Sequence, residues 1–258
     1  MVNDQKELIV GGRQKNQSYK AEASGIAVLQ SPLFFIDYKG IVRKDMKKYT
    51  KEEAINIVVE CAKAYKNELA GRSLLFIGID KQKKTSFVEL SFYGNNFMHL
   101  TGLKAPRRDK ANRPFANAFY KKCLNHKLSP TDFDFSDDGT THMKLEVLPG
   151  IINKYLQAHM IGDYDTTKPR LVTEKLAGST SACMGFIFDQ KLKQYVPNTV
   201  VKEDIRDITR RYSTVIAVYR KAIDDLQYTE MTFKSKKVDF SVIDFPDEFK
   251  YLSEEYRD

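Results

Sequence analysis

The hydrophobic pattern of this chain changes near residue 170, from helix-like spacing to a series of short strand-like runs. Before that point, apolar residues recur at three- and four-residue steps, which is typical of amphipathic helices. After it, β-branched and aromatic residues form runs that predict short strands at 170–176, 182–188, 194–200, 213–220 and 228–233. Helices followed by a strand-rich half predict an α+β fold.

The clearest predicted helix begins at Thr50. Thr50 and Glu53 have the spacing of a capping box, in which each side chain binds the backbone N–H of the other residue. Gly71 supplies the expected stop. One apolar face is formed by Ala54, Ile57, Val58, Cys61, Ala62, Tyr65 and Leu69.

Further elements are predicted on both sides of this helix. Residues 26–42 are apolar enough for one or two edge strands. Strands are expected at 74–79, 86–93 and 142–148, with a basic hairpin turn between the first two. Helices are expected at 114–124, with Asn112 as its cap, and at 149–158.

Composition and patterning divide the 258 residues into an N-terminal extension (1–45), a main domain (46–234) and an acidic C-terminal tail (235–258). A hydrophobic content of 42%, with 16 Phe and 14 Tyr, excludes wholesale disorder. The net charge of +8 favours polyanionic partners, although charge alone does not identify one. The tail could fold back onto the basic segment 99–127, but a solvated terminal helix is the favoured interpretation.

Cysteine usage and hydropathy predict a cytoplasmic protein without a membrane partner. Cys61, Cys123 and Cys183 form an odd set without CxxC spacing, which favours buried reduced thiols in a reducing compartment. The first residues lack the pattern of a secretory signal, and the early apolar run at 33–36 is too short to span a bilayer.

No metal or cofactor site is predicted. The acidic sequence DFDFSDDG at 132–139 lacks the pattern of a calcium loop or a histidine pair, so a turn with solvated acids is the better interpretation. Walker-type and Rossmann glycine patterns are also absent from the sequence.

The segment NNFMHLTGLK at 95–104 is the first candidate for chemistry. His99 can exchange a proton near neutral pH, and the Thr101 hydroxyl and the Lys104 ammonium can hold a phosphate. A structurally packed histidine is the competing interpretation. The segment leads into the basic residues Arg107, Arg108, Lys110 and Arg113.

A second polar segment follows a predicted strand near residue 195. Tyr195, Asn198 and Thr199 can form hydrogen bonds, and Arg206 can bind phosphate oxygens in a bidentate manner. The segment by itself is equally well described as a strand end with a proline at a sheet edge.

Several motifs in order resemble one family: NFMHLTGLK, FYKKCLNHKL, a DGTT turn followed by a lysine-containing segment that ends in LEVLP, CMGF, YVPNT and IAVYRK. Over about residues 50–233, the chain resembles the fourth phage-associated branch of the barnase, EndoU, colicin and RelE-like nuclease superfamily. The resemblance implies N-terminal helices packed on an antiparallel sheet of about four strands. It also implies cleavage of RNA without a metal, through attack of the ribose 2′-hydroxyl on the adjacent phosphate.

Residue roles follow from the resemblance as expectations. His99 is the expected acid or base, Lys104 and Arg206 are the expected phosphate clamps, and Thr101 and Thr199 are the expected positioners. The RNA-binding residues are expected to be Arg107, Arg108, Lys110, Arg113, Tyr195, Asn198 and Lys221, with Lys221 also a second cationic candidate.

The family context implies a toxin or effector in conflict between phages and other mobile elements, with RNA as substrate and a neutralising or assembly protein as a possible partner. Two alternatives stay open. The chain can be a catalytically inactive module that binds nucleic acid or protein on the same scaffold, or an accessory subunit of a phage-defence assembly. An enzyme requires His99 and Arg206 in one cleft, whereas a binding module requires only a continuous basic surface with stacking aromatic residues.

Overall fold

A computed structural model of the chain describes residues 47–106, 115–168, 171–236 and 239–256. Its helices are α1 (Lys51–Glu68), α2 (Phe97–Thr101), α3 (Phe115–Leu124), α4 (Thr140–Ile151) and α5 (Ile205–Ile208). The 3₁₀ helices are η1 (Gly94–Asn96), η3 (Phe240–Val242) and η4 (Asp247–Tyr256). The strands are β1 (Arg72–Ile79), β2 (Thr85–Phe92), β3 (Met160–Tyr164), β4 (Lys175–Gly178), β5 (Cys183–Asp189), β6 (Gln194–Val201), β7 (Thr209–Ala222) and β8 (Glu230–Lys234).

Helix α1 starts as its sequence predicts. The Thr50 hydroxyl oxygen accepts a hydrogen bond from the Glu53 N–H at 3.2 Å, and the Glu53 carboxylate accepts one from the Thr50 N–H at 2.8 Å. The helix ends at Glu68, and Gly71 then adopts a left-handed φ of 77° before β1 begins. The predicted capping box and apolar face are both confirmed.

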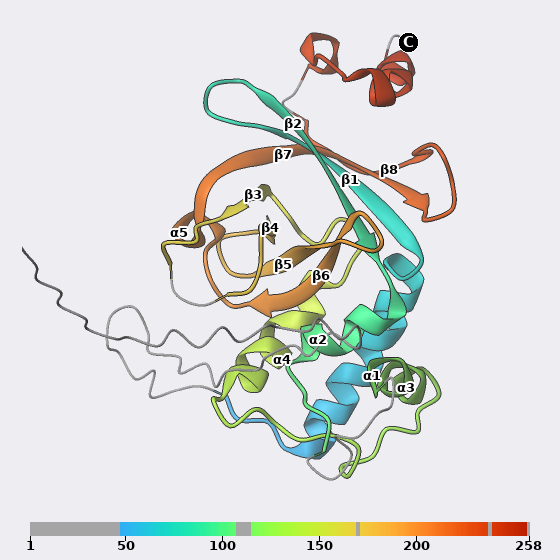
Figure 1. Cartoon of the computed structure of the whole chain (residues 1–258), viewed down its shortest axis with the longest axis vertical. Coiled ribbons are helices and arrows are strands. Elements are labelled where there is room, and N and C mark those ends of the chain that lie inside the picture. The colour runs from blue at the N-terminus through green and yellow to red at the C-terminus, as the bar shows by residue number, and fades with distance from the viewer. Residues whose placement is uncertain (1–46, 107–114, 169–170, 237–238, 257–258) are drawn as a thin grey trace, which may run out of the picture. The chain divides into compact units, whose positions relative to one another are not determined.

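The eight strands form one sheet in the order β1-β2-β6-β5-β4-β3-β7-β8. The long strand β7 pairs with β3 through its first half and with β1 through its second half, so the sheet closes on itself (Figure 1). All pairings are antiparallel except the single contact between β2 and β6 at Leu90 and Tyr195. The predicted α+β class is confirmed, with a larger sheet than the resemblance implied.

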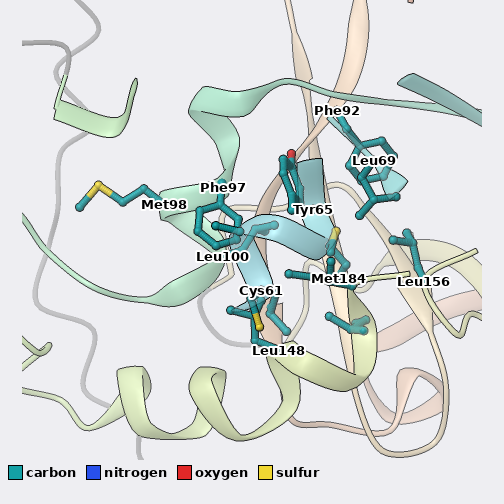
Figure 2. Packing of buried hydrophobic residues seen from close by; sticks show 14 of the residues in the cluster. Cys61, Tyr65, Leu69, Phe92, Phe97, Met98, Leu100, Leu148, Leu156 and Met184 are labelled. Atoms are coloured by element: carbon teal, nitrogen blue, oxygen red, sulfur yellow. The ribbon is translucent and has the colours of Figure 1, made fainter. Parts of the chain in front are cut away.

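The main core joins helices α1 to α4 to the inner face of the sheet. Tyr65 of α1 is fully buried, and its ring centroid lies 5.3 Å from that of Phe97 on α2 and 6.3 Å from that of Phe92 on β2. Figure 2 shows these three aromatic side chains together with Leu148 of α4 and Met184 of β5. Because α2 contributes Phe97 and Leu100 to this core, its position relative to the sheet is set by packing.

Two sequence-based expectations between residues 140 and 165 are wrong. Residues 142–148 belong to helix α4, not to a strand, and no helix follows at 152–158. The alternation in MKLEVL resembles a strand, but the buried residues Thr141, Leu145, Leu148 and Ile151 follow a helical period. Pro149 is tolerated in the last turn of α4, where it removes a single intrahelical donor.

Boundaries elsewhere differ by smaller amounts, but the sequence patterns did not predict the short helices α2 and α5. Strand β4 begins at Lys175, later than the expected run at 170–176, and strand β3 was not expected. The expected edge strands at 26–42 lie outside the described residues.

The C-terminal tail packs on the outer face of the sheet through apolar side chains. Phe245, Phe249 and Leu252 are at most 7% exposed and share a cluster with Ile77 of β1 and Tyr219 of β7. The favoured interpretation of a solvated terminal helix is therefore wrong. In the described part of the chain, the tail contacts strands β1, β2 and β7 and also Tyr228, which precedes β8. The expected boundary after residue 234 therefore lies between segments that share one hydrophobic cluster.

Candidate functional site

His99 lies on α2, a single turn of helix that follows strand β2. The buried side chains of Met98 and Leu100 flank it in the sequence, whereas His99 itself is exposed. Gly102 ends the helix with a left-handed φ of 72°. The local fold therefore turns two apolar side chains into the core and leaves the imidazole at the surface.

In the part of the chain that the structure describes, the Thr101 hydroxyl forms hydrogen bonds only with backbone groups of its own turn. Its hydroxyl donates a hydrogen bond to the Met98 carbonyl at 2.8 Å and accepts one from the Leu103 N–H at 3.1 Å. The residue is fully buried. Its hydroxyl stabilises the turn after α2 and is not accessible to a ligand in this structure.

Helix α4 contacts the turn after α2 through two side chains. The Lys144 ammonium donates to the His99 carbonyl oxygen at 3.4 Å, and the Thr141 hydroxyl donates to the Gly102 carbonyl oxygen at 2.7 Å. A Cβ at position 102 would lie 2.8 Å from Lys144 Cδ and 3.1 Å from Thr141 Cα. Glycine is thus required at 102 both by its φ and by the close passage of Lys144.

The surrounding protein partly desolvates both basic groups and lowers the pKa of each. Desolvation lowers the pKa of Lys144 from its usual value of 10.5 to about 8, against the opposing effect of the Asp138 carboxylate. Desolvation and the nearby charge of Lys144 both lower the pKa of His99. At neutral pH His99 is therefore mostly a neutral imidazole, and Lys144 is a charged ammonium that can give up its proton readily.

Lys104 lies close to the same turn. Its backbone forms an isolated bridge with Asp134, and its side chain is exposed. Burial opposes ionisation of Asp138, but hydrogen bonds from Ser136 and Thr140, together with the charge of Lys104, lower the pKa of its carboxyl overall. Lys104 and Lys144 both act electrostatically on Asp138, so the two ammonium groups share one neighbourhood. The expected binding residues Arg107, Arg108, Lys110 and Arg113 lie outside the described residues.

The second predicted segment, residues 195–199 on β6, does not contribute side chains to the group around His99. Val200 on β6 packs into the main core, whereas its neighbour Thr199 is 9% exposed and lies against Gly185, where a Cβ would come within 2.7 Å of the Thr199 methyl group. The Asn198 amide donates to the Val172 carbonyl and its oxygen accepts from the Thr173 hydroxyl at 3.3 Å. These two side chains hold neighbouring segments of the sheet in place.

Arg206 is not brought to His99. Its guanidinium binds both carboxylate oxygens of Asp204, with donor–acceptor distances of 2.5 to 3.0 Å. Helix α5, which carries Arg206, packs mainly on β3, β4 and β7, whereas α2 packs mainly on β6 and helices α1, α3 and α4. The two helices are well separated in Figure 1.

Tyr195 and Lys221 make aromatic and cation–π contacts within the protein. The Tyr195 ring lies edge-on to Phe188 at 5.2 Å, with the Lys175 ammonium 5.1 Å from its centroid. The Lys221 ammonium lies 4.9 Å from the centroid of Tyr228, a residue of the outer cluster under the C-terminal tail. The predicted residues therefore fall into a group around α2 and several positions on the sheet.

Lys144 was not singled out by sequence reasoning. The segment around it was interpreted as a strand, and in a strand Thr141 and Lys144 would point to opposite faces. In a helix they are three residues apart on one side, which directs both toward the turn after α2. The helical spacing of Thr141, Leu145 and Leu148 was the signal that could have revealed this.

Neither a metal-binding cluster nor a membrane-spanning helix occurs among the described residues. No group of three or more His, Cys, Asp or Glu side chains in this part of the chain is arranged to hold a metal ion. None of the described helices has the length and hydrophobicity needed to cross a bilayer. All three cysteines are buried and unpaired, as their sequence contexts predict, and burial raises the pKa of each thiol to about 12.

Comparison with known proteins identifies a family. The model of the family described as phage-Barnase-EndoU-ColicinE5/D-RelE like nuclease4 matches residues 57–237, which is more than half of the chain. No curated protein and no solved structure gives a significant match. The matched range contains both β2–α2–α4 and the sheet, and it confirms the resemblance seen in the sequence motifs. The chain therefore belongs to the phage-Barnase-EndoU-ColicinE5/D-RelE like nuclease4 family.

Proposed function

We propose that this nuclease is an endoribonuclease that cleaves RNA without a metal ion, through attack of the ribose 2′-hydroxyl on the adjacent phosphate. The observation that carries the proposal is the contact between the Lys144 ammonium and the His99 carbonyl oxygen at 3.4 Å. It brings a cation whose pKa is lowered to about 8 close enough to the imidazole for its charge to lower the pKa of His99. RNA is the substrate that supplies the attacking hydroxyl, because DNA lacks the 2′-oxygen.

The proposed chemistry assigns one proton to each group. Neutral His99 accepts the proton of the 2′-hydroxyl as the 2′-oxygen bonds to phosphorus. The Lys144 ammonium stabilises the charge on the phosphorane and donates its proton to the departing 5′-oxygen as the phosphorus–oxygen bond breaks. The products are a 2′,3′-cyclic phosphate and a 5′-hydroxyl, and Lys104 together with the basic residues at 107–113 binds neighbouring phosphates.

The other predicted site residues take no part in this chemical step. Arg206 is already neutralised by Asp204, and the Thr101 hydroxyl and the Asn198 side chain bind the protein backbone. Three other predicted residues contact neighbouring side chains or backbone on the sheet: Thr199, Tyr195 and Lys221. Their role in RNA binding stays a prediction.

The proposed biological role is that of a toxin or effector in conflict between phages and other mobile elements. It rests on the phage context in the description of the family. An RNA-cleaving toxin needs a protein that neutralises it in the cell that makes it, so we propose such a partner. The cytoplasmic location, where RNA is abundant and thiols stay reduced, remains a prediction from the sequence.

The test is a cleavage assay in EDTA on total RNA and on single-stranded DNA, with the end groups of the products identified. We expect the wild type to cut RNA and leave 2′,3′-cyclic phosphates, and His99→Ala and Lys144→Ala to lose at least about 100-fold in rate, the size of general acid–base effects. His126→Ala removes an exposed histidine after α3 and should retain full activity, as should Arg206→Ala.

Three outcomes would contradict the proposal. Cleavage of DNA at a comparable rate, or dependence on added metal, would refute the proposed chemistry. Full activity of His99→Ala would remove the proposed base. RNA binding without cleavage by the wild type would favour the catalytically inactive binding module.

A further inference from the structure

A hollow of about 320 Å³ opens between helices α1 and α3. It is lined by Lys63, Lys66 and Asn67 of α1, by Lys121 and Leu124 of α3, and by Asn125, which follows α3. Three of the six lining side chains are ammonium groups, two are carboxamides that can donate hydrogen bonds, and none is a carboxylate. The polar groups of the hollow therefore match an anionic ligand.

The charge of this hollow is only partly balanced by the protein. The Lys63 ammonium lies 2.7 Å from the Glu60 carboxylate, and both side chains are exposed, so the pair is screened by water. Lys66 and Lys121 are exposed. The guanidinium of Arg72 donates to the Asn67 carbonyl, which adds a further cation near the hollow.

A simpler structural role exists for two of the three lysines. Lys66 and Lys121 lie in the last turns of α1 and α3, where positive charge interacts favourably with the helix dipole. That effect favours a lysine at each helix end, but it does not require the two helix ends to share one concave surface with two amides.

The hollow is connected to the candidate site through α3. Tyr120, next to Lys121, has its ring centroid 5.3 Å from that of Phe97, which is two residues before His99. Lys121 also belongs to the segment 99–127, which contains eight Lys or Arg residues and one acidic residue. Helix α3 therefore packs against the helix that carries His99 and also lines the hollow.

We propose that this hollow, which we call the α1–α3 pocket, binds a backbone phosphate of the nucleic-acid substrate away from the bond that is cut. The substrate class rests on the proposed function, whereas the anionic character of the ligand follows from the lining side chains. Phosphate contacts of this type position a nucleic acid without reading its sequence. The pocket thereby fixes the path of the strand over the helical layer.

The test measures binding separately from cleavage. In a His99→Ala background, a fluorescein-labelled single-stranded oligoribonucleotide is titrated against the full chain with and without Lys66→Gln and Lys121→Gln. The matched control carries Lys154→Gln and Lys191→Gln, two exposed lysines outside the pocket that remove the same charge. Urea unfolding of each variant checks that the surface changes leave the fold intact.

We expect the dissociation constant of the pocket variant to rise about 10-fold or more, and the slope of log K against log salt to fall by about 1. The control should change less than about 3-fold. In the cleavage-competent background, the pocket variant should raise KM and leave kcat at saturating RNA unchanged.

Equal weakening by the pocket and control variants would show a non-specific charge effect and overturn the proposal, as would unchanged binding by the pocket variant. The matching deoxyribonucleotide separates the two proposals. If the wild type cuts no RNA but binds either strand in a pocket-dependent way, the ribonuclease proposal fails and the pocket stands. If it binds neither strand, the pocket proposal fails as well.

Discussion

Replacing Lys144 with methionine should make the protein more stable and less active. Methionine keeps the length of the side chain and its packing over Gly102, but it removes the ammonium group. Lowering the pKa of Lys144 from 10.5 to about 8 corresponds to about 3 kcal/mol of lost stability at neutral pH, at about 1.4 kcal/mol for each pKa unit. Partial exposure of the side chain reduces the expected gain for Lys144→Met to about 2 kcal/mol.

The pH dependence of this gain gives a sharper test than its size. The pKa of Lys144 is lower in the folded than in the unfolded protein, so between about pH 8 and 10.5 the unfolded chain binds more protons. The contribution of Lys144 to wild-type stability therefore rises with pH in this window. The difference in unfolding free energy between Lys144→Met and wild type should be largest at pH 7 and approach zero near pH 10.5.

The measurement is urea unfolding of both proteins at several pH values from 7 to 10.5, with Lys191→Met, an exposed substitution in the turn between β5 and β6, as control. Taking the difference between two proteins cancels the titration of groups that they share. A Lys144→Met variant that is less stable than wild type at pH 7, or a difference independent of pH, would refute the assignment of Lys144 as a desolvated cation.

Three further predictions concern stability. Thr50→Ala should lower the free energy of unfolding by about 1 kcal/mol, because it removes the hydroxyl of the capping box, whereas exposed Thr229→Ala should not. Tyr120→Phe should raise Tm slightly or leave it unchanged, because the buried Tyr120 hydroxyl has no partner among the described residues; a loss above about 1 kcal/mol would contradict this. His142 accepts a hydrogen bond from the Tyr49 N–H at 3.1 Å, and burial and a nearby positive charge lower its pKa, so its contribution to stability is lost as pH falls through about 6.5. His142→Gln should make urea midpoints between pH 7 and 5 less sensitive to pH, and an unchanged slope would argue against this role.

Local patterns predicted the parts of the fold that depend on neighbours in sequence. The capping box of Thr50 and Glu53 needs only residues within one turn, and it formed as expected. Strand β6 at 194–201 was recognised because a short run rich in β-branched and aromatic residues favours an extended backbone. The family was recognised from motifs in order, without knowledge of how they pack.

Where local sequence signals conflict, tertiary packing determined the secondary structure and the burial of the segment. The sequence around residues 140–151 alternates like a strand and contains a proline, yet it forms a helix because Leu145, Leu148 and Ile151 bury together against the core. The C-terminal tail was interpreted as solvated from its acidic composition, whereas Phe249 and Leu252 cover the outer face of β1 and β7. Burial of apolar area outweighs weak local preference in both cases.

Sequence patterns were sufficient for the α+β class and for the family, and they singled out His99 without showing whether its side chain is packed or exposed. The tertiary structure alone decided which charged groups are neighbours. It brought Lys144 to His99 across 45 positions of the chain and kept Arg206 with Asp204 on another part of the sheet. The physical reason is that acid–base chemistry depends on distances and desolvation between side chains, and these arise only when helices and strands pack against one another.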